Sequence, residues 1–298
     1  MKLFAPKYYS KFKCIADKCP HSCCVGWEID IDKDTMKKYS RLKKGYGKEI
    51  KESIEKGDTP HFRLLDGERC YHLNEKGLCK IILNCGEEYL CQICKEHPRF
   101  YNYTNYGKEV GLGMSCMEAC RIILESDEYA DFCEMADSEG EAEIIEFDGC
   151  MERSKIFKIL KSHQICYTEK LRLIRETFDV CPERLDDEVW KGCFYGLEYL
   201  DESHKNLFLS YEAEADVPKV LEKSLERALS YFVFRHCTEA SCYEEFRISL
   251  GFCLVMERLL ASMASKKPEN VCEYAVILSE EIEYSIDNTE IIKNKFGE

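Results

Sequence analysis

Residues 14–27 read Cys-Ile-Ala-Asp-Lys-Cys-Pro-His-Ser-Cys-Cys-Val-Gly-Trp and hold four cysteines within eleven positions. Seven more follow, so eleven of the chain's twenty cysteines lie in its first 120 residues. The N-terminus has no apolar signal core, and no stretch reaches the roughly 18 apolar residues of a spanning helix, so we expect a cytoplasmic protein without a transmembrane segment. In a reducing compartment clustered cysteines do not form a disulfide framework. Their grouping therefore indicates a metal site.

The charge of the chain changes where the cysteine cluster ends. Residues 1–124 carry a net charge of +5 and the remainder −19, giving −14 over 298 residues. The acidic half argues against a nucleic-acid partner, whereas nearby cations suit a site that holds several thiolates. We therefore predict two domains: a cysteine-rich metal or iron–sulfur module over 1–124 and a helical domain over 125–298.

The hydrophobic periodicity changes with the charge. Strands are predicted at 26–32, 62–65, 70–73 and 78–83, and a helix start at Ser115–Glu118, which places Cys116 at a helix N-terminus. Six helical segments are predicted later, at 155–161, 169–178, 185–199, 218–235, 243–264 and 268–284, with one strand at 144–147. The expected fold is mainly α, with a small cysteine-rich α+β metal module followed by a helical bundle.

The cysteine spacing does not determine which metal is bound. Thiolate-rich sites select zinc, copper(I) or iron–sulfur clusters. Only Cys91-x2-Cys94 has the spacing of a zinc knuckle, and the closely spaced cysteines of ferredoxins are missing. His21, His72 and His97 lie among the cysteines, where surface or hydrogen-bonding roles compete with metal ligation. No dinucleotide fingerprint or P-loop is present.

At these residues the chain resembles the FliB family of flagellin lysine-N-methylases, which is related in cysteine pattern to the YkgJ-type zinc- or iron-chelating domains. The likeness rests on residues 12–32, 70–81, 94–99, 112–121 and 231–236. Met117 stands where the family usually has proline, and Cys85, Cys91 and Cys120 fall where other residues are common. The core ligand set that the resemblance implies is Cys14, Cys19, Cys23, Cys24, Cys70, Cys79, Cys94 and Cys116.

The resemblance implies methyl transfer from S-adenosylmethionine to lysine ε-amino groups of a protein such as flagellin, by an enzyme that needs a [4Fe–4S] cluster. Eight thiols exceed the four that one cluster requires, so a zinc site can accompany it. Arg99, Arg235 and His236 are the candidate catalytic residues, and Arg99 and Arg121 the candidate cofactor-binding residues, because they can hold a carboxylate or orient a substrate.

A second interpretation comes from a different class of protein. A YkgJ-like protein would bind zinc or iron without catalysis, and its cysteine module would scaffold the helical half for binding a partner. Iron bound to the purified protein together with a matching amount of sulfide would favour the enzyme over this alternative.

Overall fold

The computed structural model describes residues 2–43, 45–57, 59–137, 147, 149–182, 185–238 and 240–296. The chain divides into two compact units. The smaller unit comprises Lys13–Pro98, and the larger one comprises residues 1–12 together with Arg99–Glu298. Residues 1–12 and 99–124, which the predicted boundary assigns to the cysteine-rich domain, pack with the larger unit.

The smaller unit combines short strands with short helices. Strands β2 (Ile29–Asp30), β4 (His61–Phe62) and β3 (Ile54–Glu55) form one sheet in that order, and β5 (Leu64–Leu65) pairs with β6 (Arg69–Cys70). The helices are α1 (Lys33–Arg41), α2 (Gly47–Glu52), α3 (Lys80–Cys85) and α4 (Gln92–Glu96). They enclose a core that includes Tyr39, Phe62, Cys70 and Cys91.

One carboxylate ties two helices of the smaller unit together. Asp32 caps α1 by accepting the Thr35 N–H at 2.9 Å, and its other oxygen accepts the Gln92 N–H at the start of α4, also at 2.9 Å. Although burial opposes it, these backbone donors lower the pKa of Asp32 to about 2. The carboxylate therefore fixes the start of the helix that carries Cys94.

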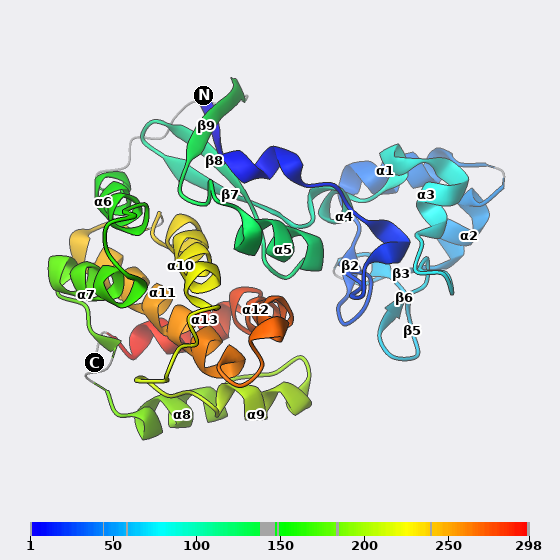
Figure 1. Ribbon diagram of the computed structural model, residues 1–298. Coiled ribbons are helices and arrows are strands. Elements are labelled where there is room, and N and C mark those ends of the chain that lie inside the picture. Colours follow the sequence, from blue (N-terminus) through cyan, green and yellow to red (C-terminus); the bar gives the residue numbers. More distant parts are fainter. Residues whose placement is uncertain are drawn as a thin grey trace. The chain divides into compact units, whose positions relative to one another are not determined.

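The larger unit contains a four-stranded sheet in the order β7-β8-β1-β9 (Figure 1). Its strands are β1 (Lys2–Pro6), β7 (Arg99–Thr104), β8 (Gly107–Leu112) and β9 (Phe132–Asp137). β8 pairs antiparallel with β7 and parallel with β1, while β9 runs antiparallel to β1. The sheet thus joins the N-terminus to segments more than 100 residues away.

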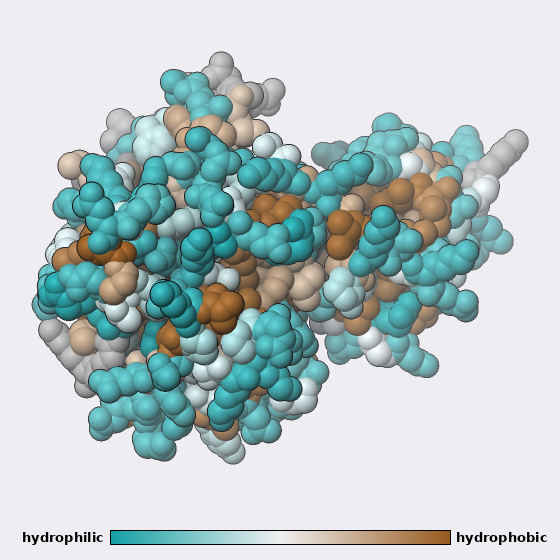
Figure 2. Space-filling model, in the orientation of Figure 1, coloured by the Kyte–Doolittle hydropathy of each residue, from teal (hydrophilic) through white to brown (hydrophobic). Residues whose placement is uncertain are grey.

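Helices make up most of the larger unit. They are α5 (Met117–Glu125), α6 (Cys150–Leu160), α7 (Tyr167–Phe178), α8 (Asp187–Tyr195), α9 (Lys205–Phe208), α10 (Glu222–His236), α11 (Tyr243–Ala264), α12 (Val271–Leu278) and α13 (Ile286–Asn294), with the π-helix η7 (Ser279–Glu283) after α12. Every residue of α11 from Ser249 onward is buried, so α11 is the central helix of this unit. Hydrophilic residues cover most of the visible face (Figure 2).

The prediction of a mainly α chain with some β structure is confirmed. The predicted strand at 78–83 is wrong, because the chain forms α3 there, and the predicted capping box is wrong because Cys116, not Ser115, is the N-cap of α5. Within the described residues, no helix combines the length and apolar composition needed to cross a bilayer. The predicted strand at 144–147 lies outside the described residues except for residue 147.

Gly107 lets β8 lie against β1. A Cβ atom built on Gly107 would stand 2.4 Å from the backbone oxygen of Lys2, which cannot move without breaking the sheet. We expect Gly107→Ala to lower the free energy of unfolding by about 2–3 kcal/mol, measured by urea denaturation. Gly192→Ala in α8 is the matched control, because its Cβ meets open space, and it should stabilise by about 0.5–1 kcal/mol. Equal effects would contradict the close contact.

Candidate metal centre

Six thiols of the smaller unit lie close enough to affect one another's ionisation. Cys70 and Cys91 are buried in the core of this unit, Cys24, Cys79 and Cys94 pack against it, and Cys23 adjoins Cys24 on the exposed side. Cys85 also packs against the core but lies outside this group, because burial and Glu88 alone raise its pKa. Different elements supply them. Cys70 ends β6, Cys79 is the N-cap of α3, Cys91 is the N-cap of α4, and Cys94 lies within α4. The fold thus brings together three separate stretches of the sequence.

These thiols influence one another's ionisation. A hydrogen bond with Cys24 lowers the pKa of Cys23 to about 7, and one with Cys94 lowers the pKa of Cys91. The pKa values of their partners shift in the opposite direction. Hydrogen bonding and burial raise the pKa of both Cys24 and Cys94, and the negative charge of a Cys70 thiolate raises both values further. Several thiolates so close together repel one another. A bound cation is what would allow them to ionise together.

The geometry of the Cys91–Cys94 pair suits a shared metal. Their sulfur atoms are 3.8 Å apart. Two thiolates each about 2.3 Å from one tetrahedral metal would also lie about 3.8 Å apart. Over the described residues, no group of three or more His, Cys, Asp or Glu side chains converges closely enough to hold a metal ion. The donor chemistry therefore fits a soft metal, and the distance between the Cys91 and Cys94 sulfur atoms is compatible with one.

The other predicted ligands are more dispersed. Cys14 is exposed and accepts the Ala16 N–H at 3.4 Å, and Cys19 is half-buried; both belong to the smaller unit. Cys116 belongs to the larger unit, as the N-cap of α5. Cys91, which the resemblance set aside, lies beside Cys94 instead. The signal for it was the two-residue spacing of Cys91-x2-Cys94.

His72 supports the core of the smaller unit. Its Nδ1 hydrogen bonds with the Tyr46 hydroxyl and its Nε2 with the Ser53 hydroxyl, both at 2.8 Å. Burial lowers the pKa of His72 to about 3, so the ring stays neutral. Since both nitrogens are engaged, His72 has none left for a metal.

In the larger unit, Arg235 and His236 meet at a buried glutamate. Glu283 accepts hydrogen bonds from the Tyr231 hydroxyl at 2.9 Å and from His236 Nε2 at 2.6 Å, and it lies 3.4 Å from Arg235 Nε. The carboxylate is wholly buried. It sits at the end of the π-helix η7, a wider helical turn that often occurs at functional sites.

The same cluster reaches the segment before α5. The Tyr231 hydroxyl also accepts the Met114 N–H at 3.2 Å and an N–H of Arg235 at 2.8 Å. Burial lowers the pKa of His236 and outweighs the opposing effect of Glu283, so its ring is neutral. Glu283 accepts from Nε2–H, which leaves the Nδ1 lone pair of His236 available. This arrangement can take up a proton.

The two remaining predicted residues differ in setting. Arg99 begins β7; its Nε donates to the Tyr9 hydroxyl at 2.9 Å and its guanidinium faces the rings of Tyr9 and Phe12. Arg121 is half-exposed on α5, where it forms ion pairs with Glu118 and Glu125 one turn away on either side. Arg121 therefore lies on a solvent-exposed face of the helix.

No protein-family model matches the chain, and no solved structure matches it. The flagellar biosynthetic protein FliU of Salmonella muenchen is 27% identical over 175 residues, which span 54% of this chain and 95% of that protein. The lysine-N-methylase of Salmonella typhimurium is 30% identical over 139 residues, 42% of this chain and 33% of that protein; its counterpart in Salmonella choleraesuis matches to the same extent. The chain thus covers about a third of the length of these lysine-N-methylases. These similarities support a FliB-like relationship, and the link to YkgJ-type domains stays a prediction.

Proposed function

We propose that the chain is an S-adenosylmethionine-dependent methyltransferase that acts on lysine side chains of a protein, flagellin or one like it, and that uses a thiol-bound [4Fe–4S] cluster. The observation that carries the proposal is the gathering of six thiols in one small unit of a chain similar to proteins named lysine-N-methylase. The flagellar name of one relative and the name lysine-N-methylase of the two others support a protein substrate.

Two kinds of group are bound under this proposal. Cys24, Cys70, Cys79, Cys91 and Cys94 are the thiols from which the cluster ligands would come, and Cys14, Cys19 and Cys23 of the same unit would serve a second metal such as zinc. When bound, S-adenosylmethionine supplies an electrophilic methyl group on a sulfonium. The cluster, when bound, would supply either an iron atom that anchors this cofactor or an electron for it.

The chain must also prepare the lysine. A lysine ε-ammonium has a pKa near 10.4 and cannot attack a methyl group until it loses its proton. His236 is our candidate proton acceptor, because its ring is neutral and Glu283 fixes which nitrogen carries the hydrogen. Arg235 and Tyr231 would hold that carboxylate in place.

Anaerobic purification tests the proposal. We expect iron with matching sulfide, binding of S-adenosylhomocysteine by calorimetry, and transfer of a labelled methyl group to flagellin lysines. We also expect His236→Gln to lower the rate of transfer at least about a hundredfold while leaving cofactor binding intact. Stoichiometric zinc without iron, together with no binding of S-adenosylhomocysteine, would reject the methyltransferase and favour the non-catalytic alternative.

A further inference from the structure

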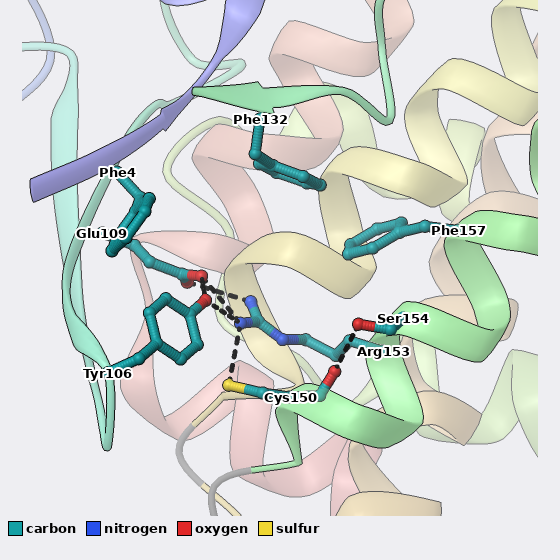
Figure 3. Close-up of a pocket in the computed structure, with 8 residues that line it drawn as sticks. All are labelled: Phe4, Tyr106, Glu109, Phe132, Cys150, Arg153, Ser154 and Phe157. Atoms are coloured by element: carbon teal, nitrogen blue, oxygen red, sulfur yellow. Dashed lines mark hydrogen bonds and ion pairs between the residues drawn. The ribbon is translucent and has the colours of Figure 1, made fainter. Parts of the chain in front are cut away.

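A pocket of about 180 Å³ opens in the larger unit between its sheet and α6 (Figure 3). Aromatic rings from three elements form its walls: Phe4 of β1, Phe132 of β9 and Phe157 of α6. The ring of Tyr106 packs edge-on against Phe4, with centroids 5.1 Å apart, and Phe132 lies 5.0 Å from Phe157. The walls are therefore flat, apolar and already packed against one another.

A buried ion pair forms the polar side of the pocket. The guanidinium of Arg153 crosses from α6 to the carboxylate of Glu109 and binds it through two hydrogen bonds of 3.0 and 2.8 Å. Each side chain is less than 5% exposed. Arg153 also donates to the Phe234 carbonyl, the Tyr106 hydroxyl and the Cys150 sulfur. The two charges thus cancel inside the protein.

One donor of this network has no partner. The Nε–H of Arg153 is buried and makes no hydrogen bond with any residue that the structure describes. A guanidinium carries five N–H donors, and leaving a buried donor without a hydrogen bond destabilises the protein. Buried groups of this kind are nearly always paired with protein, water or ligand. The side chain that carries this donor lines the pocket.

We propose that this pocket binds a small, neutral, planar ring that carries a hydrogen-bond acceptor. The aromatic walls suit a flat ligand, and the acceptor would satisfy Arg153 Nε. A cavity of about 150 Å³ lined by apolar side chains is known to hold benzene, so 180 Å³ admits a ring of one or two small cycles. None of the residues that we assign to the metal centre or to methyl transfer lines this pocket.

The charges of the pocket exclude ionic ligands. A cation would lie beside the guanidinium of Arg153, and an anion beside the carboxylate of Glu109, with neither able to displace the existing pair without exposing a buried charge. A neutral ring avoids both costs. Such a ring can belong to a free heteroaromatic metabolite or to the base of a nucleoside cofactor, and competition distinguishes these sources.

Benzimidazole and indole provide the test, because they share shape and size while only benzimidazole has an acceptor nitrogen. At neutral pH we expect the full chain to bind benzimidazole about tenfold more tightly than indole, by calorimetry and ligand-observed NMR. Ser154→Trp, which places a large side chain at the pocket, should weaken benzimidazole binding at least tenfold. Lys155→Trp, one residue along the same helix, is the matched control and should leave it unchanged, with both variants checked for folding by circular dichroism.

Competition by S-adenosylhomocysteine then supports a nucleoside base as the natural ligand, and its failure to compete supports a separate small molecule. Equal affinity for the two probes, binding unaffected by Ser154→Trp, or a crystal structure in which only water occupies Arg153 Nε would overturn the inference. A failure of benzimidazole to bind would leave the proposed methyl transfer untouched, because that reaction is measured separately on flagellin.

Discussion

Glu283→Gln is expected to lower the free energy of unfolding by about 3–5 kcal/mol, because it leaves Arg235 as a buried charge without its counter-ion. The carboxylate is wholly buried and Arg235 is 13% exposed, so water does not replace the lost partner. Tyr231 and His236 donate to different oxygens of the carboxylate, and the amide keeps only one of these acceptors, so the loss combines the unpaired charge with one broken hydrogen bond. Urea denaturation measures it. Glu176→Gln, in an exposed pair with Arg172 of α7, is the control and should change stability by less than about 0.5 kcal/mol.

The pH dependence of stability provides an independent check on this cluster. Although burial opposes it, Arg235 and His236 lower the pKa of Glu283 from 4.5 to about 2. A carboxyl with a lowered pKa contributes stability above its unfolded pKa and loses it as the pH falls towards 2, here by about 3 kcal/mol. His236, whose pKa is also lowered, adds a loss that begins as the pH falls through its unfolded value near 6.5. Glu283→Gln should remove the part below about pH 4.5, and parallel profiles for the two proteins would contradict this assignment.

The helical half was predictable from its sequence, whereas the sheet was not. The periodicity of apolar residues located α7, α10 and α11 to within a few residues, because those helices bury one face or more against a core. The sheet depends on β1 pairing with β8, which lies about 100 residues away, and β1 is only five residues long. Local patterns carry no information about such a pairing.

The apolar run that was misread lies beside Cys79. Ile81, Ile82 and Leu83 suit a strand or a buried helix equally well, and only the tertiary structure selects α3, where Ile81 enters the core and Leu83 stays exposed. Cys79 itself pairs antiparallel with Leu73 and is also the N-cap of α3, so the error concerns the residues after it.

For the candidate sites, composition predicted that cysteines would form a site, but it did not predict which individual residues lie close together. Eleven clustered cysteines indicated a metal module, and the structure groups six of them while Cys116 belongs to the other unit. Glu283 could not be identified from sequence, because it is one of 56 acidic residues. Only its burial against Arg235 and His236 distinguishes it.

Cys91→Ser and Cys94→Ser are each expected to weaken metal binding at least about a hundredfold, because even the loss of a group that only supports a ligand costs 10–100-fold. Their sulfur atoms are 3.8 Å apart and each controls the other's ionisation. Bound iron, sulfide and zinc would be measured per chain after anaerobic gel filtration with a chelator. Metal binding stabilises the folded state, so the two variants should also lose the rise in melting temperature that metal gives the unaltered chain.

Cys85→Ser is the matched control for this pair. Cys85 ends α3 in the same unit and packs at the edge of the same core, and it lies outside both the thiol group and the implied ligand set. We expect it to retain full metal content. If Cys91→Ser also retained its metal while Cys94→Ser lost it, Cys91 would be a neighbour of the site rather than a ligand, and the 3.8 Å spacing would reflect only two thiols sharing a proton. If both retained it, the metal would have to lie among the remaining thiols, of which Cys14, Cys19 and Cys23 would be the next to replace.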